Sequence, residues 1–202
     1  KSIVENGTRG VLVITADKGL AGAYNHNVIS ETMKQLEKRI PLMAQKVSET
    51  LENFELADGR YTVKGIYKGC EVVADYAHHP TAARATIEAA SNMPHNNILD
   101  VFQPLTYDRT KKLFGDYVSS LLPCRKVLFA EIFSDREINM HDISSKDICD
   151  AINEQGGDAE FYETKEEIIP RLDELVNEGD IILILGPEDI RSLGDILMTR
   201  GN

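Results

Sequence analysis

Residues 70–91, CEVVADYAHHPTAARATIEAAS, pass from a strand pattern through a polar loop into a helix pattern. The apolar run 70–74 predicts a buried strand. Residues 81–91 have the composition of a helix, and Pro80 suits the first turn because no N–H donor is needed there. This strand–loop–helix unit is the building block of an α/β protein.

Strand and helix patterns alternate along the chain on both sides of this unit. Predicted strands cover residues 61–66, 70–74, 98–102, 126–132, 159–162 and 181–185. Predicted helices cover residues 81–91, 109–122, 145–154 and 189–198, and another begins at Thr164. The first two strands form a hairpin around Lys68-Gly69. The alternation predicts an α/β fold: a three-layer sandwich with a mostly parallel, Rossmann-like sheet and helices on both faces.

Length and composition are those of an ordinary globular protein. The chain has 202 residues, of which 42% are hydrophobic and 27% charged, and this balance excludes a disordered tail or a small disulfide scaffold. It has no apolar run of roughly 18 residues and no signal-peptide pattern, so no membrane partner is expected. Its three cysteines lie far apart, which argues against disulfides and favours a cytoplasmic setting. The net charge of −11 argues against nucleic-acid binding.

Polar side chains gather in the loop between strand 70–74 and the helix that follows it. Asp75, Tyr76, His78 and His79 come directly after the strand, and parallel sheets bind ligands at the carboxyl ends of their strands. Adjacent histidines can bind a metal or an anion, or relay protons. The alternative is a solvated surface loop whose histidines have no such role. The residues alone leave both interpretations open.

Residues 75–81 (DYAHHPT) resemble the motif that opens the C-terminal domain of the Mur ligase family, in particular of its L-alanine-adding members. Further motifs of that domain follow in the family's order. They are GIYKG at 65–69, VFQP at 101–104, EIFSDRE at 131–137 and GDIILILGPEDI at 179–190. The resemblance covers about residues 52–202, so residues 51–202 are interpreted as a Mur-ligase-like C-terminal α/β domain.

Two short segments depart from the family's pattern. Leu105 and Thr106 stand where the family usually has His-Arg, and GPED at 186–189 replaces Gly-Ala-Gly-Asp. The family uses the missing arginine near its amino-acid substrate. Threonine lacks the planar cationic group that holds a carboxylate by two hydrogen bonds. The usual amino-acid site is therefore expected to be incomplete, although Arg109 is retained.

The resemblance implies an activity for the complete enzyme. Mur ligases use ATP and Mg²⁺ to join an amino acid to a nucleotide-sugar carboxylate, through an acyl phosphate, in the synthesis of peptidoglycan precursors. Their C-terminal domain contributes contacts to the amino acid and the nucleotide, whereas the phosphate cradle belongs to the central domain. This chain has no G-x4-G-K-[ST] phosphate loop. It is expected to be inactive alone, to carry no cofactor alone, and to need the missing N-terminal and central domains as partners.

The resemblance and the strand order together give a set of candidate substrate-binding residues, with no catalytic residue and no metal ligand among them. These are Asp75, Tyr76, His78, His79, Tyr107 and Arg109. They are expected to line one cleft, because neighbouring parallel strands bring their carboxyl-end loops together. Arg109 is the candidate anion contact, since a guanidinium holds a carboxylate or phosphate by two hydrogen bonds. An ion pair between Arg109 and Asp75 is the alternative.

The N-terminal region carries a second resemblance. Residues 11–29 (VLVITADKGLAGAYNHNVI) resemble the strand, loop and helix that start the globular domain of the gamma subunit of rotary ATP synthase, over about residues 9–38. Residues 1–50 are therefore predicted to be a βα element, in which strand 10–16 joins a sheet under helix 21–40. Their slight positive charge contrasts with the acidic remainder. Two alternatives stay open: a chimeric or engineered α/β domain without catalytic function, and a gamma-like interaction module.

Overall fold

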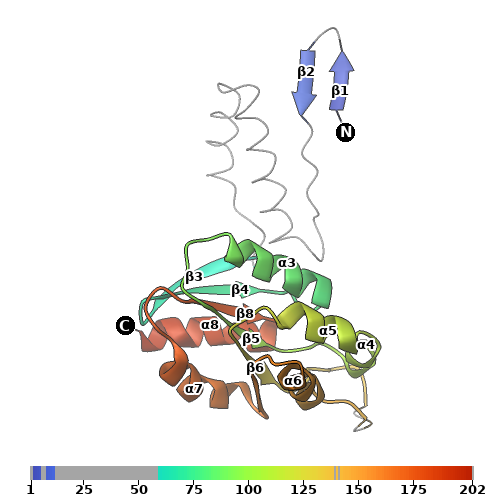
Figure 1. Cartoon of the computed structure of the whole chain (residues 1–202), viewed down its shortest axis with the longest axis vertical. Helices are drawn as coiled ribbons and strands as arrows, with labels where there is room; N and C mark the ends of the chain where they lie inside the picture. Colours follow the sequence, from blue (N-terminus) through green and yellow to red (C-terminus); the bar gives the residue numbers. More distant parts are fainter. Residues whose placement is uncertain (1, 6–7, 12–58, 139, 141, 202) are drawn as a thin grey trace.

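A six-stranded sheet forms the centre of the computed structural model, which describes residues 2–5, 8–11, 59–138, 140 and 142–201 (Figure 1). Its strands, in the spatial order β3-β4-β8-β5-β6-β7, are β3 (Thr62–Tyr67), β4 (Cys70–Asp75), β8 (Ile181–Leu185), β5 (Ile98–Phe102), β6 (Lys126–Ala130) and β7 (Ala159–Tyr162). β3 pairs antiparallel with β4, and the other neighbours are parallel. The predicted hairpin and the mostly parallel sheet are both confirmed.

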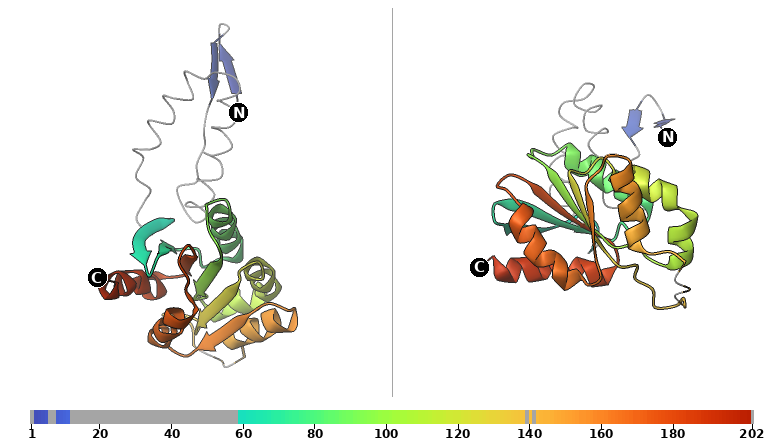
Figure 2. Two further views of the ribbon diagram at one scale, coloured as in Figure 1. Left: turned by 60° about the vertical axis from the view of Figure 1, so that its left-hand side comes forward. Right: turned by 60° about the horizontal axis from the view of Figure 1, so that its bottom comes forward.

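Helices cover both faces of this sheet, as predicted. They are α3 (Pro80–Ser91), α4 (Tyr107–Lys112), α5 (Phe114–Leu121), α6 (Ser145–Glu154), α7 (Ile168–Leu175) and α8 (Glu188–Arg200), with a 3-10 turn η1 (Lys165–Glu167) before α7. One buried cluster joins the sheet to α3, α5 and α6, and a second joins the opposite face to α7 and α8. Figure 2 shows these layers on the two sides of the strands.

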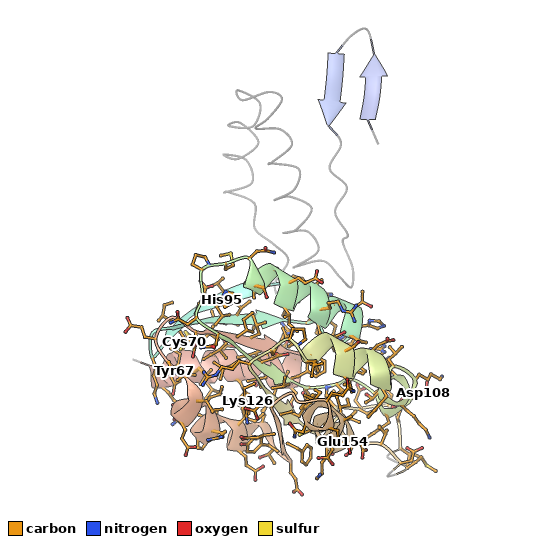
Figure 3. All side chains as sticks on the ribbon, viewed as in Figure 1. Tyr67, Cys70, His95, Asp108, Lys126 and Glu154 are labelled. Carbon is orange, nitrogen blue, oxygen red and sulfur yellow. The ribbon has the colours of Figure 1, made fainter. Side chains whose placement is uncertain are left out.

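The order of the strands brings several polar loops to one edge of the sheet. β8 lies between β4 and β5, and all its residues are buried, as expected for a central parallel strand. At its end the Gly186 N–H donates to the Asp75 carbonyl at 3.1 Å, and the Gln103 N–H donates to the Leu185 carbonyl at 3.0 Å. Figure 3 places Cys70, at the start of β4, and Asp108, on the helix that follows β5, on opposite sides of the molecule. The loops after β4, β5 and β8 therefore meet at the carboxyl edge.

The predicted single helix over residues 109–122 is wrong, because the structure has two helices there. α4 ends at Lys112 and α5 begins at Phe114. Between them Leu113 has φ −108° and ψ 19°, outside the helical region, although its N–H still donates to the Arg109 carbonyl. Leu113 and Phe114 both pack against the first buried cluster.

The first residues of the chain form a separate two-stranded sheet. β1 (Ser2–Glu5) pairs antiparallel with β2 (Thr8–Val11), and Ser2 lies opposite Val11. Within the described residues, the start of the predicted strand 10–16 therefore pairs with β1 and not with the six-stranded sheet. The rest of that strand and the predicted helix 21–40 lie outside the described residues.

The outer edge of β7 is capped by a side chain of the preceding helix. Asn153 of α6 donates through Nδ2 to the Ala159 carbonyl at 2.9 Å. The Ala159 N–H donates in return to Asn153 Oδ1 at 2.8 Å. One amide side chain thus pairs with both backbone groups of Ala159.

Four charged side chains and one tyrosine around β7 form a group that we call the β7 cluster: Lys126, Asp158, Glu160, Tyr162 and Arg171. Lys126 Nζ lies 2.5 Å from an Asp158 oxygen and 2.6 Å from a Glu160 oxygen. Arg171 donates from Nε and Nη2 to the two oxygens of Glu160, at 2.9 and 2.8 Å. The Tyr162 hydroxyl also donates to Glu160, at 2.6 Å. Each charge in the cluster has an opposite charge beside it.

Candidate functional site

A pocket of about 450 Å³ opens at the carboxyl edge of the sheet, and we call it the carboxyl-edge pocket. It is lined by Arg60, Tyr76, His78, His79, Thr81, Ala82 and Arg109. Four of the six residues proposed from the sequence are among these: Tyr76, His78, His79 and Arg109. They come from the loop after β4 and from α4, as the parallel strand order predicts.

Backbone hydrogen bonds fix the loop after β4. The Tyr76 N–H donates to the Gly59 carbonyl and the His78 N–H donates to the Tyr76 carbonyl, both at 2.9 Å. The Tyr117 hydroxyl donates to the His78 carbonyl, also at 2.9 Å. His79 caps α3, since its Nδ1 accepts the Thr81 N–H at 3.2 Å. The two histidines are therefore held in place by the elements around them.

Both histidines have lowered pKa values. Burial lowers the pKa of His78 to about 4, and the positive charges of Arg109 and His79 act in the same direction. The pKa of His79 is lowered as well, first by burial and then by Arg109. His78 Nδ1 is buried and has no hydrogen-bond partner among the described residues. At neutral pH the pocket therefore contains uncharged imidazoles. Because His79 Nδ1 already accepts a hydrogen bond, its Nε2 carries the proton and can donate to a ligand.

Aromatic and cationic groups surround the ring of Tyr76. Its centroid lies 4.6 Å from that of the His78 ring, with the planes at 82° in an edge-to-face contact. The guanidinium carbon of Arg60 lies 5.1 Å from the Tyr76 centroid, and that of Arg191 lies 5.5 Å away. Both distances are within the range of cation–π attraction. The ring thus connects His78 to two arginines that lie on other elements.

Arg109 presents a cationic group for which the described residues provide no full set of partners. Its Nη1 is buried and makes no hydrogen bond with any of them. The start of its helix is held by the loop after β6. There the Thr106 N–H donates to the Phe133 carbonyl at 2.9 Å, and the Tyr107 N–H donates to a Glu137 oxygen at 2.5 Å. Thr106 has φ 69° and ψ 137°, a strained conformation for a β-branched residue.

Two of the proposed site residues do not line the pocket. Asp75 is only 3% exposed and accepts the Thr86 hydroxyl at 2.7 Å; burial raises the pKa of its carboxyl group. No ion pair joins Asp75 to Arg109 in the described part of the chain, so that alternative is wrong. Tyr107 also lies outside the lining, and its backbone faces Glu137.

Sequence reasoning missed Arg60, Thr81 and Ala82. Thr81 and Ala82 follow the histidines directly at the start of α3. Arg60 had a signal in the hairpin: Thr62 pairs with Ala74, so antiparallel pairing brings residues just before β3 beside those just after β4. In the observed register, which shifts by one residue between Val63 and Gly65, extending the hairpin by two residues places Arg60 opposite Tyr76.

The chemistry available in the pocket is that of anion binding. An arginine with an unpartnered nitrogen and two neutral imidazoles fit a carboxylate or a phosphate group. Among the described residues, no group of three or more His, Cys, Asp or Glu side chains could hold a metal ion. Cys70, Cys124 and Cys149 are buried and free. The helices in the same part of the chain include none long and apolar enough to cross a membrane.

Comparisons with known proteins give the family. The model of the Mur ligase, glutamate ligase domain, matches residues 59–187. A UDP-N-acetylmuramate–L-alanine ligase of Caldanaerobacter subterraneus is 38% identical over 75% of this chain and 33% of its own length. One of Lachnospira eligens is 32% identical over 98% of this chain and 42% of its own. The chain thus spans less than half the length of these relatives.

Solved structures show the same fold. The UDP-N-acetylmuramate–alanine ligase of Thermotoga maritima superposes with a TM-score of 0.61 and 22% identity, over 97% of this chain and 41% of that one. A domain of a related ligase from Haemophilus ducreyi superposes with a TM-score of 0.54 and 23% identity, over 71% of this chain and 100% of that one.

The ligase similarity is not confined to residues 51–202. The match to the Lachnospira eligens ligase extends over 197 residues, so it reaches into the region likened to the gamma subunit. Residues 12–38 of that region lie outside the described residues, and the gamma-subunit resemblance stays a prediction. The matched family model covers the β4 loop, the two histidines and Arg109, and the chain belongs to the Mur ligase family through its glutamate ligase domain.

Proposed function

We propose that this chain is the C-terminal part of an ATP-dependent ligase that joins L-alanine to UDP-N-acetylmuramate. The observation that carries the proposal is the carboxyl-edge pocket, in which the buried Nη1 of Arg109 has no partner among the described residues while His78 and His79 are uncharged. The chain spans 42% of the Lachnospira eligens ligase. The missing N-terminal and central domains are therefore its partners, and the cytoplasm is the compartment for its nucleotide substrates.

The pocket is suited to one anionic group of a substrate. Arg109 supplies the only guanidinium of α4, since Thr106 offers a hydroxyl where the family usually has arginine. Neutral imidazoles add hydrogen bonds without adding charge. Two structural neighbours, the FolC protein of Escherichia coli and the folylpolyglutamate synthase of Mycobacterium tuberculosis, were solved with ADP, and superpose with TM-scores of 0.54 and 0.51. ADP is therefore a suitable probe.

ATP and Mg²⁺ belong to the complete ligase in this proposal. The sequence has no G-x4-G-K-[ST] motif, and backbone N–H groups of such a loop are what cradle the phosphates. The isolated chain is therefore expected to release no phosphate from ATP with Mg²⁺, UDP-N-acetylmuramate and L-alanine. Phosphate release that depends on L-alanine would contradict this part of the proposal.

The division of the chain at residue 50 is also a proposal. A chimeric domain without function and a gamma-like interaction module remain the alternatives to a ligase fragment. The 197-residue match to one ligase favours the fragment.

An NMR titration tests the pocket. ADP is added to the ¹⁵N-labelled chain, and in a parallel sample acetate provides a carboxylate without a nucleotide. Amide shifts are expected to cluster at residues 76–82 and around Arg109, and Arg109→Met is expected to abolish them. Arg84→Met, at an exposed site on α3, is the control. Shifts that are absent at millimolar concentrations of both ligands would overturn the proposal.

A further inference from the structure

Arg191 of α8 lies next to the carboxyl-edge pocket without lining it. Its side chain is 14% exposed and forms an ion pair with Glu188, one turn earlier on the same helix. Its guanidinium carbon lies 5.5 Å from the centre of the Tyr76 ring. The Nε atom is buried and makes no hydrogen bond with the described residues. The ion pair therefore satisfies Nη2 of the guanidinium and leaves Nε without a hydrogen bond among the described residues.

Gly59 provides the space that Arg191 occupies. The glycine has φ +76°, and a methyl group at its Cα would overlap the Arg191 guanidinium. Its carbonyl accepts the N–H of Tyr76 at 2.9 Å. Arg60, the next residue, lines the pocket and places its guanidinium carbon 5.1 Å from the same Tyr76 ring. Arg191 thus contacts both the turn that carries Arg60 and the ring of Tyr76.

We propose that Arg191 is a positioning residue of the pocket, which holds the Tyr76 ring and the Gly59–Arg60 turn in the arrangement that binds an anion. The guanidinium is attracted to the face of the tyrosine ring, and its flat group fits against a Cα that bears no side chain. Tyr76 in turn packs against the edge of His78. Arg191 therefore acts on the pocket through Tyr76 and does not touch the anion. This inference rests on the proposed function.

The first experiment measures ADP binding and one spectroscopic signal. Arg191→Met keeps the length of the side chain and removes its charge. Arg200→Met is the matched control, because Arg200 lies on the same helix and its 3.1 Å ion pair with Asp173 is remote from the pocket lining. Arg191→Met is expected to weaken ADP binding about fivefold, a usual coupling for groups in contact. The control is expected to bind like the wild type.

The spectroscopic signal is the ¹H shift of the His78 ring in the absence of ADP. The Tyr76 ring, 4.6 Å away and nearly perpendicular, imposes a ring-current shift on it. Arg191→Met is expected to change this shift through Tyr76, which contacts both Arg191 and His78. Arg200→Met is expected to leave the shift unchanged. A loss of overall stability alone would not produce this pattern. An unchanged His78 shift in a folded Arg191→Met variant would overturn the inference.

A double-mutant cycle shows whether Arg191 acts at Gly59. Gly59→Ala forces the guanidinium out of its place, and Arg191→Ala removes it. If the inference holds, the combined variant loses less ADP affinity than the two single losses added together. Additive losses would overturn it. If Gly59→Ala fails to fold, the Arg191→Met measurements decide.

The two proposals fail in different ways. A wild-type chain that does not bind ADP contradicts the proposed function, and the His78 shift then decides the role of Arg191. A wild-type chain that binds ADP while Arg191→Met binds equally well contradicts the inference alone.

Discussion

In the β7 cluster both cations face carboxylates, whereas in the carboxyl-edge pocket Arg109 has a nitrogen without a partner among the described residues. Hydrogen bonds from Arg171 are the largest cause that lowers the pKa of Glu160 to about 2. Burial is the largest cause that lowers the pKa of His78 to about 4. The first shift reflects an interaction already made, and the second reflects solvation that has been lost.

This difference teaches how to tell a binding site from a structural ion network. Shifted pKa values occur in both regions, so a shift alone does not identify a site. What separates them is whether the groups that carry charge find partners inside the chain. Every charge of the β7 cluster has an opposite charge beside it within the described residues. The pocket keeps an unused donor beside two neutral imidazoles.

The largest effect on the free energy of unfolding is expected at Asp100, which is an exception to this distinction between the pocket and the β7 cluster. Both carboxyl oxygens are buried without a partner in the described residues, although the groups around them form no anion-binding pocket like that of Arg109 among the pockets described above. Burial raises its pKa well above the usual value. The pKa of Asp100 is higher in the folded chain than in the unfolded one. The free energy of unfolding is therefore highest below about pH 4, where the carboxyl is protonated in both states, and it decreases as the pH rises. Asp100→Asn is expected to raise the free energy of unfolding near pH 8 by about 2 kcal/mol.

Urea unfolding at several pH values checks this prediction. Asp195→Asn, at an exposed position of α8, is the control and is expected to change the free energy of unfolding by less than about 0.5 kcal/mol. If Asp100→Asn were no more stable than the wild type at pH 8, the carboxyl group would have a partner after all. Asp100 would then no longer be an exception.

Breaking the β7 cluster is expected to have the next largest effect. Lys126 has a side chain only 8% exposed and lies within 2.6 Å of both Asp158 and Glu160. Lys126→Met leaves those carboxylates without this cation and is expected to cost about 2 kcal/mol of unfolding free energy. Lys146→Met breaks the exposed pair with Asp150 and is expected to cost less than about 0.5 kcal/mol. Equal losses for the two variants, measured by urea unfolding, would show that the cluster is only a surface network.

Sequence patterns predicted the limits of the strands better than the faces of the sheet to which individual side chains point. The apolar runs of β5 and β8 gave their limits correctly, because a central parallel strand is covered on both faces. The limits of the edge strand β7 were also predicted correctly. Asp75 was assigned to the pocket since it follows an apolar run. The structure extends β4 to this residue, so Asp75 shares a face with Val73, which packs in the first buried cluster. Because side chains alternate between the two faces of a strand, this inward direction of Asp75 could have been predicted from the sequence.

Other features had no local signal. The break at Leu113 was missed because no proline marks it in the sequence. Arg191 was missed because its partners, Gly59 and Tyr76, lie more than a hundred residues away in the sequence. Such contacts follow from the position of β8 beside β4, which an alternation of strands and helices does not define.

The pH dependence of folding sharpens the comparison on the pocket side. His78 has its folded pKa near 4 and its unfolded pKa near 6.5. Stability is therefore complete above about pH 6.5 and falls as the pH decreases toward 4, since the unfolded chain binds the proton more readily. In His78→Gln, the loss of unfolding free energy between neutral and acidic pH is expected to be smaller than in the wild type by on the order of 1 kcal/mol. This figure allows for the solvent that reaches the ring. His95→Gln, away from the pocket, is the control in thermal melts at pH 7 and 5, and equal slopes for both variants would refute the assignment.

The smallest effect on stability is expected at Arg109 itself. Arg109→Met removes a charge that has no ion-pair partner in the described residues, so the free energy of unfolding at pH 7 is expected to change by less than about 0.5 kcal/mol. The same substitution is expected to raise the pKa values of His78 and His79, because the Arg109 charge lowers both. NMR titration of the two imidazoles checks the direction. A large loss of stability with unchanged pKa values would make Arg109 a structural residue.

The amide of Asn153 has a consequence for how this molecule behaves at high concentration. A strand at the border of a sheet offers free N–H and C=O groups to other chains, and such borders promote aggregation. By pairing with both groups of Ala159, Asn153 acts as the last, one-residue strand of the sheet. A passing chain meets a side chain there instead of an open backbone. Asn153, which belongs to a helix, is therefore expected to hinder edge-to-edge pairing of this strand with other chains at Ala159.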